Sequence, residues 1–195
     1  TLPDCTRGLK IIVGTVPIVV LGYLGSDIIE NNLRSLWLIA TTLIVFGVIL
    51  GLADTYGKRE RTLDQLSNRH GIMYGLAQAL ALMPGVSRSG ATIAMGRFLG
   101  YKREAALRYS FLLALPAVFG SGFYQLQGAI SSTESNVFSL AETAVATGIA
   151  FVVGYLVIAW LLKFVSTKSF MPFIIYRIAL GMLLLILLGT GVISA

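Results

Sequence analysis

The chain has 195 residues, of which 56% are hydrophobic and only 12% are charged. Soluble domains carry roughly 25% charged residues, so this composition argues against a water-soluble globular enzyme. The net charge is +6, and the basic residues fall between apolar runs, a pattern that fits membrane topology and binding of anionic lipid better than binding of nucleic acid. The single cysteine, Cys5, excludes an internal disulfide. We therefore predict an all-α, polytopic membrane protein.

Apolar segments long enough to cross a bilayer as helices occur five times, since a crossing takes about 20 residues. These segments are residues 9–26, 36–53, 109–126, 137–162 and 172–193. Pro17 and Pro116 fall inside two of them, where neighbouring helices can satisfy the freed backbone carbonyls. The pattern predicts five transmembrane helices within one membrane-embedded domain over residues 1–195.

Residues 71–100 are also apolar, but Pro84-Gly85-Val86-Ser87-Arg88-Ser89-Gly90 interrupts them in the middle. Each side is about half as long as a span, because about 10 residues of helix rise only about 15 Å. This pattern predicts a re-entrant helical hairpin that enters and leaves the membrane on the same side. The alternative is a single span that is kinked at Pro84.

The distribution of Lys and Arg favours the hairpin. If the hairpin returns to its own side, Arg34 faces one side of the membrane and twelve basic residues face the other. The twelve are Arg7, Lys10, Lys58, Arg59, Arg61, Arg69, Lys102, Arg103, Arg108, Lys163, Lys168 and Arg177. If residues 71–100 formed a full span instead, Lys163, Lys168 and Arg177 would lie on the opposite side of the membrane, and the difference in basic residues between the two sides would be smaller. The positive-inside rule then places the carboxyl terminus outside the cell.

Arg88 stands at the middle of this hairpin, where a charged side chain costs at least about 2.5–3.5 kcal/mol on insertion scales. It must therefore have a partner or line a polar pocket. Hydroxyl groups surround it in the sequence, from Ser87, Ser89 and Thr92. An arginine fork beside several hydroxyls is well suited to bind phosphate.

The glycines of the same segment strengthen this interpretation. Gly85 and Gly90 let backbone N–H groups approach a ligand closely, and a helix begins near Gly90 with its positive dipole end toward the turn. Together these features predict an anion-binding turn. The alternative is a Pro-Gly turn with capping serines and an arginine that extends to water.

The run from Ala79 to Thr92, ALALMPGVSRSGAT, resembles the second signature of the undecaprenyl-diphosphate phosphatase family of the bacitracin-resistance type. Gln78 stands where that family has a Gln before the signature. Residues 12–17, 104–116 and 170–177 resemble further segments of the family. The resemblance extends over nearly the whole chain.

The resemblance implies an integral enzyme of the bacterial plasma membrane that hydrolyses undecaprenyl diphosphate to undecaprenyl phosphate and phosphate. This reaction recycles the lipid carrier for peptidoglycan synthesis, cell-wall biogenesis and cell shape, and confers bacitracin resistance. The implied fold is half of an inverted-repeat architecture. The implied partners are the lipid substrate, membrane lipids and a second copy of the chain as a candidate, with no nucleic acid.

The resemblance also implies roles for seven residues. Those expected to act in catalysis are Ser87, Arg88 and Thr92, with Arg88 binding the diphosphate and stabilising developing charge. Those expected to bind or support the substrate are Gln78, Gly85, Ser89 and Gly90.

One part of the family pattern has no match in the chain, namely an amino-terminal Glu-x-x-x-Glu motif followed by Pro-x-Ser-Ser-x-Gly-His. We therefore expect a carboxy-terminal fragment that is inactive by itself, with no metal ligands of its own. The Mg²⁺ or Ca²⁺ that the family implies would need ligands outside the chain. A non-hydrolytic lipid-phosphate transporter or flippase-like binder is the alternative function, because the chain offers no candidate base.

The other polar residues are expected to be unremarkable. Asp54, Glu60 and Asp64 are interpreted as parts of a solvated cytoplasmic loop. His70 is expected in a loop or facing lipid, and Arg97 is expected to be merely tolerated near the hairpin's end.

Overall fold

The computed structural model describes residues 2–25, 35–131 and 140–194. Within these ranges the chain forms helices joined by short connections, and the only strand-like feature is an isolated bridge between Arg61 and Tyr101. The helices are α1 (Leu2–Leu24), α3 (Leu36–Tyr56), α4 (Asn68–Ala79), α5 (Arg88–Phe98), α6 (Arg103–Ser131), α7 (Leu140–Thr167) and α8 (Met171–Gly189), with short 3₁₀ turns η1 (Leu63–Gln65) and η2 (Leu80–Leu82). The predicted all-α fold is confirmed.

Helices long and apolar enough to cross a membrane number four in the described part of the chain, at Leu36–Tyr56, Arg103–Gln127, Ala141–Thr167 and Met171–Gly189. The predicted first span does form a helix, α1, but its apolar part, Lys10–Leu24, is shorter than these four. Arg34 and the predicted span residues 26 and 137–139 lie outside the described residues.

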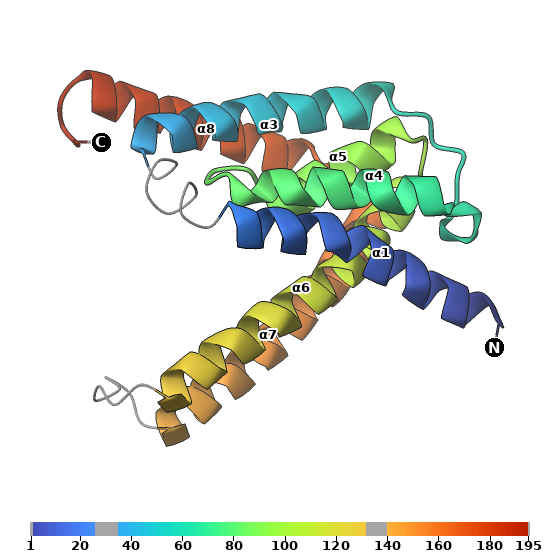
Figure 1. Ribbon diagram of the computed structural model, residues 1–195. Helices are drawn as coiled ribbons and strands as arrows, with labels where there is room; N and C mark the ends of the chain where they lie inside the picture. Colours follow the sequence, from blue (N-terminus) through green and yellow to red (C-terminus); the bar gives the residue numbers. More distant parts are fainter. Residues whose placement is uncertain (1, 26–34, 132–139, 195) are drawn as a thin grey trace.

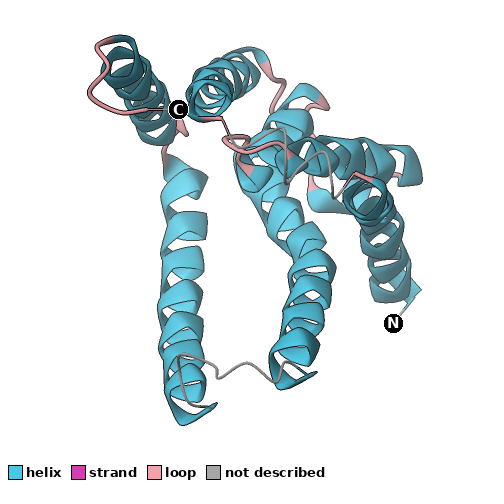
Figure 2. Cartoon of the chain, turned by 60° about the vertical axis from the view of Figure 1, so that its left-hand side comes forward, coloured by secondary structure: helices cyan, strands magenta, loops and turns pink. Residues whose placement is uncertain are grey.

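The helices form a packed body from which one helical pair projects (Figure 1). Helix α3 lies along α8, α1 lies along α4, and the short helix α5 lies between these two pairs, in contact with α3 and α4. Figure 2 shows α6 and α7 extending away from this body as two long helices. Helix α5 contacts α3, α4 and α6, so it occupies a central place in the fold.

Small residues allow the pairs of long helices to approach closely. A Cβ atom on Gly47 of α3 would come within 2.9 Å of Ile178, and one on Gly181 of α8 would come within 2.8 Å of the backbone oxygen of Ala40. A Cβ atom on Gly75 of α4 would collide with the backbone of Gly14 in α1. Small residues at helix contacts are the usual basis of tight packing in membranes, where apolar burial alone drives little association.

The hairpin predicted from the sequence is present as two antiparallel helices. Helix α4 has 12 residues and α5 has 11, and His70 near the start of α4 contacts the hydroxyl of Tyr101, which lies shortly after the end of α5. Each helix is about 16–18 Å long at 1.5 Å per residue, which is about half the hydrocarbon thickness. The prediction that residues 71–100 form a re-entrant hairpin, which enters and leaves the membrane on the same side, stays a prediction.

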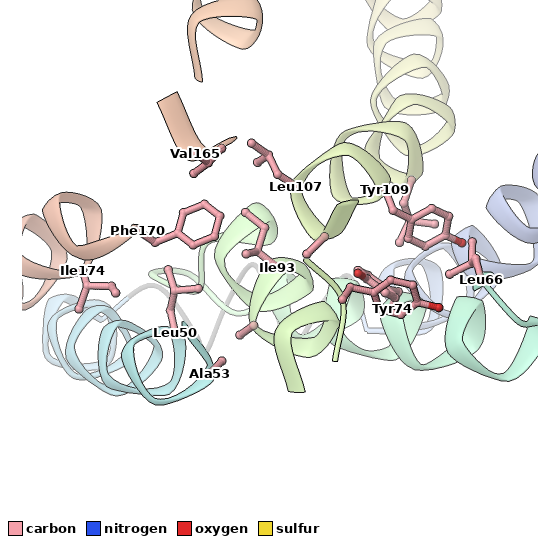
Figure 3. Close-up of a cluster of buried hydrophobic side chains, with 14 residues drawn as sticks. Leu50, Ala53, Leu66, Tyr74, Ile93, Leu107, Tyr109, Val165, Phe170 and Ile174 are labelled. Atoms are coloured by element: carbon pink, nitrogen blue, oxygen red, sulfur yellow. The ribbon is translucent and has the colours of Figure 1, made fainter. Parts of the chain in front are cut away.

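A cluster of buried apolar side chains joins the hairpin to the neighbouring helices. Figure 3 shows Leu50 of α3, Ile93 of α5, Leu107 of α6 and Phe170, which precedes α8, converging on one another. Each of these four side chains is buried. Their packing holds the middle of α5 against α3, α6 and the segment that precedes α8.

A buried ion-pair cluster ties the same helices together at the opposite end of α5. The Asp54 carboxylate accepts hydrogen bonds from Arg103 Nε at 2.6 Å and Nη2 at 2.9 Å, and Arg97 Nε lies 3.4 Å away. Arg97 is fully buried and also donates to backbone carbonyls, including those of Tyr101 at 2.6 Å and Gly57 at 3.0 Å. The expectation of a solvated Asp54 and a merely tolerated Arg97 is therefore wrong, because the two groups neutralise each other inside the protein.

Candidate anion-binding site

The turn between η2 and α5 depends on glycine. Gly85 has a φ of +86°, a backbone conformation that residues with a Cβ atom rarely adopt. A Cβ atom there would also collide with the Thr42 hydroxyl and come within 2.6 Å of the Ile39 backbone oxygen. Gly85 therefore lets the turn pack directly against α3, and its predicted role in binding or supporting the substrate stays a prediction.

Ser87 caps the amino terminus of α5. Its Oγ accepts a hydrogen bond from the Gly90 N–H at 3.1 Å, and its backbone oxygen accepts one from Ala91 N–H at 2.9 Å. The Ser89 hydroxyl lies 3.3 Å from the Ser87 hydroxyl. The N–H groups of Arg88 and Ser89 have no intrahelical acceptor in an α-helix, so this end of α5 attracts anions.

Arg177 joins this helix end from α8. Its Nη2 donates to the Gly85 backbone oxygen at 2.9 Å, while its buried Nε has no hydrogen-bond partner within the described ranges. Its Nη1 lies 3.8 Å from where a Cβ atom on Gly90 would stand. Arg177 was expected only among the basic residues that set membrane orientation, and the structure adds that its guanidinium lies at the anion-binding turn.

Arg88 is the first residue of α5, and its side chain is partly buried. Its Nη1 is buried and has no hydrogen-bond partner among the described residues. A guanidinium nitrogen shielded from water in this way is expected to gain substantially from an anionic ligand. The predicted catalytic role of Arg88 is consistent with this placement and stays a prediction.

A cavity of about 250 Å³ opens beside this helix end. At its polar end lie Ser87, Ser89, Gly90 and Arg177. The remaining walls are largely apolar and come from α3, α5, α6, α7 and the start of α8, with Leu50, Ile93, Leu107, Phe111, Leu161, Phe170, Phe173 and Tyr176 as lining residues. One side of the cavity therefore suits an anion, and the rest suits a hydrocarbon chain.

Thr92 and Gln78 lie elsewhere in the hairpin. Thr92 is fully buried, and its hydroxyl pairs with that of Ser110 in α6 and also reaches the Arg88 backbone oxygen at 2.9 Å. Gln78 is fully buried on α4, and neither its Oε1 nor its Nε2 has a partner among the described residues. Neither residue lines the cavity, and Arg88 does not line it either, although it lies between Ser87 and Ser89, which do. The cavity therefore brings together only Ser87, Ser89 and Gly90 from the predicted set, with Gly85 forming the turn.

The residues at this site do not fit a divalent metal ion. Mg²⁺ and Ca²⁺ are bound mainly by carboxylate oxygens, whereas the cavity's polar end offers hydroxyls, N–H groups and a guanidinium. Among the described residues, no three His, Cys, Asp or Glu side chains lie close enough to hold a metal ion. The polar end is suited to the anion alone.

His70 lies at the open end of the hairpin, in contact with protein groups, and the expectation of a loop or lipid-facing residue is wrong. Its Nδ1 lies 2.7 Å from the Tyr101 hydroxyl, and its Nε2 lies 3.3 Å from Arg61 Nη1. Since arginine can only donate, Nε2 is the acceptor and Nδ1 carries the proton. Burial lowers the pKa of His70 below its ordinary value of 6.5, and the charges of Arg61 and Arg69 lower it further.

The lowered pKa of His70 makes stability depend on pH. Below pH 6.5 the unfolded chain binds a proton that the folded protein resists, so stability is expected to fall as the pH drops from 6.5 toward the lowered value. The measurement is the thermal unfolding midpoint in detergent between pH 5 and 8. His70→Asn, which keeps a donor for Tyr101, should flatten this decline. An equally steep decline in the variant would contradict the role given to His70.

Comparisons with known proteins place the site in context. The family model described as bacitracin resistance protein BacA matches residues 3–183. The undecaprenyl-diphosphatase of Pseudarthrobacter chlorophenolicus is 60% identical over 194 residues, covering 99% of this chain and 70% of the relative. The undecaprenyl-diphosphatase of Micrococcus luteus is 57% identical with the same coverage. Undecaprenyl-diphosphatase 2 of Agrobacterium fabrum is 60% identical over 98% of this chain and 68% of that relative.

Proposed function

The chain belongs to the bacitracin resistance protein BacA family, and we propose that its hairpin turn binds the diphosphate group of undecaprenyl diphosphate for hydrolysis. The reaction is the removal of the terminal phosphate, which yields undecaprenyl phosphate and inorganic phosphate. The product is the lipid carrier reused in peptidoglycan synthesis. The protein is thus a membrane-embedded hydrolase, an undecaprenyl-diphosphate phosphatase.

The observation that carries this proposal is the division of the cavity into one polar end and apolar walls. A prenyl diphosphate has the same division, with two phosphates at one end of a hydrocarbon chain. The hydroxyls of Ser87 and Ser89, the first N–H groups of α5 and the Arg177 guanidinium face the polar end. The first isoprene units would then lie between Phe111, Leu161 and the other apolar lining residues.

The residues of the site supply binding, orientation and charge stabilisation. Phosphoryl transfer depends largely on positioning and on stabilising the charge of the transferred group, and guanidinium groups are well suited to both tasks. Arg88 and Arg177 would bind the phosphate oxygens, and Ser87 would hydrogen-bond one of them or attack the terminal phosphorus. A serine hydroxyl is a weak nucleophile without a base. Among the described residues, the Ser87 hydroxyl contacts the Gly90 N–H at 3.1 Å and the Ser89 hydroxyl at 3.3 Å, and neither group is a base.

The surroundings of the enzyme complete the proposal. The protein is a multi-pass membrane protein, with four apolar helices of spanning length in the described ranges. We propose that it lies in the bacterial plasma membrane with its carboxyl terminus outside the cell. We further propose that it forms a homodimer and uses a divalent cation, Mg²⁺ or Ca²⁺. That cation would be held by groups other than the described residues, so no step at this turn is assigned to it.

A second candidate function is a non-hydrolytic binder or transporter of lipid phosphates. It is favoured by the lack of a base beside Ser87 among the described residues. The two functions differ in one product, because a transporter binds undecaprenyl diphosphate without releasing inorganic phosphate.

The test uses the protein expressed in full from its own gene and purified in detergent. We expect one inorganic phosphate to be released for each undecaprenyl diphosphate consumed. Leu161→Trp, which fills the apolar part of the cavity, should lower kcat/KM about tenfold, the usual scale for a steric change in an apolar pocket. Leu156→Trp is the matched control on α7, since Leu156 is 60% exposed. Tight binding without phosphate release would favour the transporter, and equal activity of both variants would contradict the assignment of the cavity.

A further inference from the structure

Two consecutive backbone carbonyls of the turn are held by side chains from two different helices. The Pro84 oxygen accepts a hydrogen bond from the Thr42 hydroxyl of α3 at 2.8 Å. The next oxygen, that of Gly85, accepts from Arg177 Nη2 of α8 at 2.9 Å. Among the described residues no backbone N–H donates to either oxygen. Backbone carbonyls away from water need such partners, so the turn depends on these two side chains.

The Thr42 hydroxyl has one proton and three acceptors within reach. Besides Pro84, the backbone oxygens of Leu38 and Ile39 lie 2.9 and 3.0 Å away. Those two oxygens are interior to α3, where helical N–H groups supply their hydrogen bonds. Pro84 is the nearest acceptor and the one without another donor. Thr42 is also 6% exposed, so water has little access to the contact.

Helices α3 and α8 hold Thr42 and Arg177 in a fixed relation. Gly47 faces Ile178, the residue after Arg177, and Gly181 faces the backbone of Ala40, two residues before Thr42. These contacts leave no room for a Cβ atom at either glycine, so the two helices can shift little against each other. The Thr42 hydroxyl and the Arg177 guanidinium therefore bind the turn from two helices that are packed tightly against each other.

We infer that Thr42 is a positioning residue for phosphate hydrolysis, an inference that rests on the proposed function. By holding the Pro84 oxygen, Thr42 fixes the peptide plane that leads to Gly85, and the Gly85 oxygen in turn anchors Arg177. Anchored through Nη2, Arg177 keeps Nη1 and the unpartnered Nε for the substrate anion. Thr42 touches neither the cavity nor the substrate, and it acts through Arg177.

The chain offers closely matched variants for the test. Thr42→Val keeps the shape of the side chain and removes only the hydroxyl, whereas Thr42→Ser keeps the hydroxyl. Thr41→Val is the control, because Thr41 is exposed on the same helix and its hydroxyl bonds only to Trp37 of its own turn, at 2.7 Å. Thr42→Ala, which leaves extra space, replaces Thr42→Val if that variant does not reach the membrane folded.

The measurements are kcat and KM for phosphate release from undecaprenyl diphosphate, with the protein expressed in full from its own gene. We expect Thr42→Val to lower kcat about tenfold or more, Thr42→Ser to stay within about threefold of the original, and Thr41→Val to be unchanged. A packing role alone would move the thermal midpoint without this pattern of rescue. Near-normal kcat in Thr42→Val would overturn the inference.

A double-mutant cycle links Thr42 to Arg177. Because both act on the same turn, the combined effect of Thr42→Val and Arg177→Ala should be clearly smaller than the product of the separate effects. A fully multiplicative result would contradict positioning through Arg177. Binding of inorganic diphosphate to the same proteins gives a readout without hydrolysis. If the original protein binds diphosphate but releases no phosphate from undecaprenyl diphosphate, the proposed hydrolysis is contradicted. The Thr42 inference is then decided by whether Thr42→Val binds diphosphate more weakly than the original protein does.

Discussion

Arg88→Ala is expected to reduce phosphate release from undecaprenyl diphosphate by at least about 10²–10³-fold, the scale for removing one donor that stabilises transition-state charge. The first residue of α5 stands where the helix dipole and the serine hydroxyls already favour an anion. Its Nη1 is buried and has no hydrogen-bond partner in the described part of the chain, so it is expected to gain from an anion at the neighbouring helix end. The measurement is single-turnover phosphate release by the purified protein expressed in full from its own gene.

Two further variants show what the guanidinium contributes. Arg88→Lys keeps the charge but loses the planar fork, so it should restore only a small part of the activity. Arg108→Ala removes an exposed basic residue of α6 and should leave turnover within about twofold. Near-normal turnover by Arg88→Ala in a correctly folded protein would remove Arg88 from the mechanism.

Asp54→Ala is expected to cause the largest loss of stability, about 3–5 kcal/mol, because it leaves a buried charge without its partner. Arg97 is fully buried and Asp54 is 3% exposed, so little water can replace the lost carboxylate. The same carboxylate binds Arg103 of α6 and lies 3.4 Å from the Phe170 N–H that precedes α8. The variant should show a lower unfolding midpoint in detergent and a lower yield of folded protein in the membrane.

The matched control is Glu60→Gln, which removes an exposed carboxylate from the same region of sequence. Its unfolding midpoint should stay close to that of the original, since exposed charges contribute little to stability. If Asp54→Ala were as stable as Glu60→Gln, the buried cluster would not hold α3, α5 and α6 together.

Sequence alone could predict the parts of this fold that are encoded locally. The apolar length of α3, α6, α7 and α8 marked them as spans, and the interrupted stretch around Pro84 marked the hairpin. The turn itself was predictable because Gly85 and Ser87 each have a local reason for their place: a positive φ and a helix cap. These signals depend only on residues within a few positions of one another.

The partners of the turn could not be predicted in this way, because they depend on the register of distant helices. Arg177 lies 92 residues from the Gly85 oxygen that it binds, and Asp54 lies 43 residues from Arg97. The one available signal for Arg177 was its position as the only charged residue in α8. A charged side chain within an apolar helix is costly unless it has a partner, so Arg177, like Arg88, indicates a buried partner or an anionic ligand.

Nearness in sequence was also a poor guide to side-chain direction. Thr92 follows Arg88 by one helical turn, yet its hydroxyl points to Ser110 between α5 and α6. Gln78 precedes the turn by a few residues, but it is enclosed on α4. Which side of a short helix faces a cavity depends on how its neighbours pack, which the local sequence does not determine.

The charged residues of α7 limit which part of the helix can lie in the hydrocarbon layer of the membrane. The apolar helix Ala141–Thr167 has 27 residues, or about 40 Å at 1.5 Å per residue, and none of its most apolar window is buried in the protein. The uncharged run between Glu142 and Lys163 has 20 residues, or about 30 Å, which matches the thickness of the hydrocarbon layer. Leu161 near the end of the same helix lines the substrate cavity. This part of the cavity's apolar wall therefore lies near one end of the uncharged run of α7, two residues before Lys163.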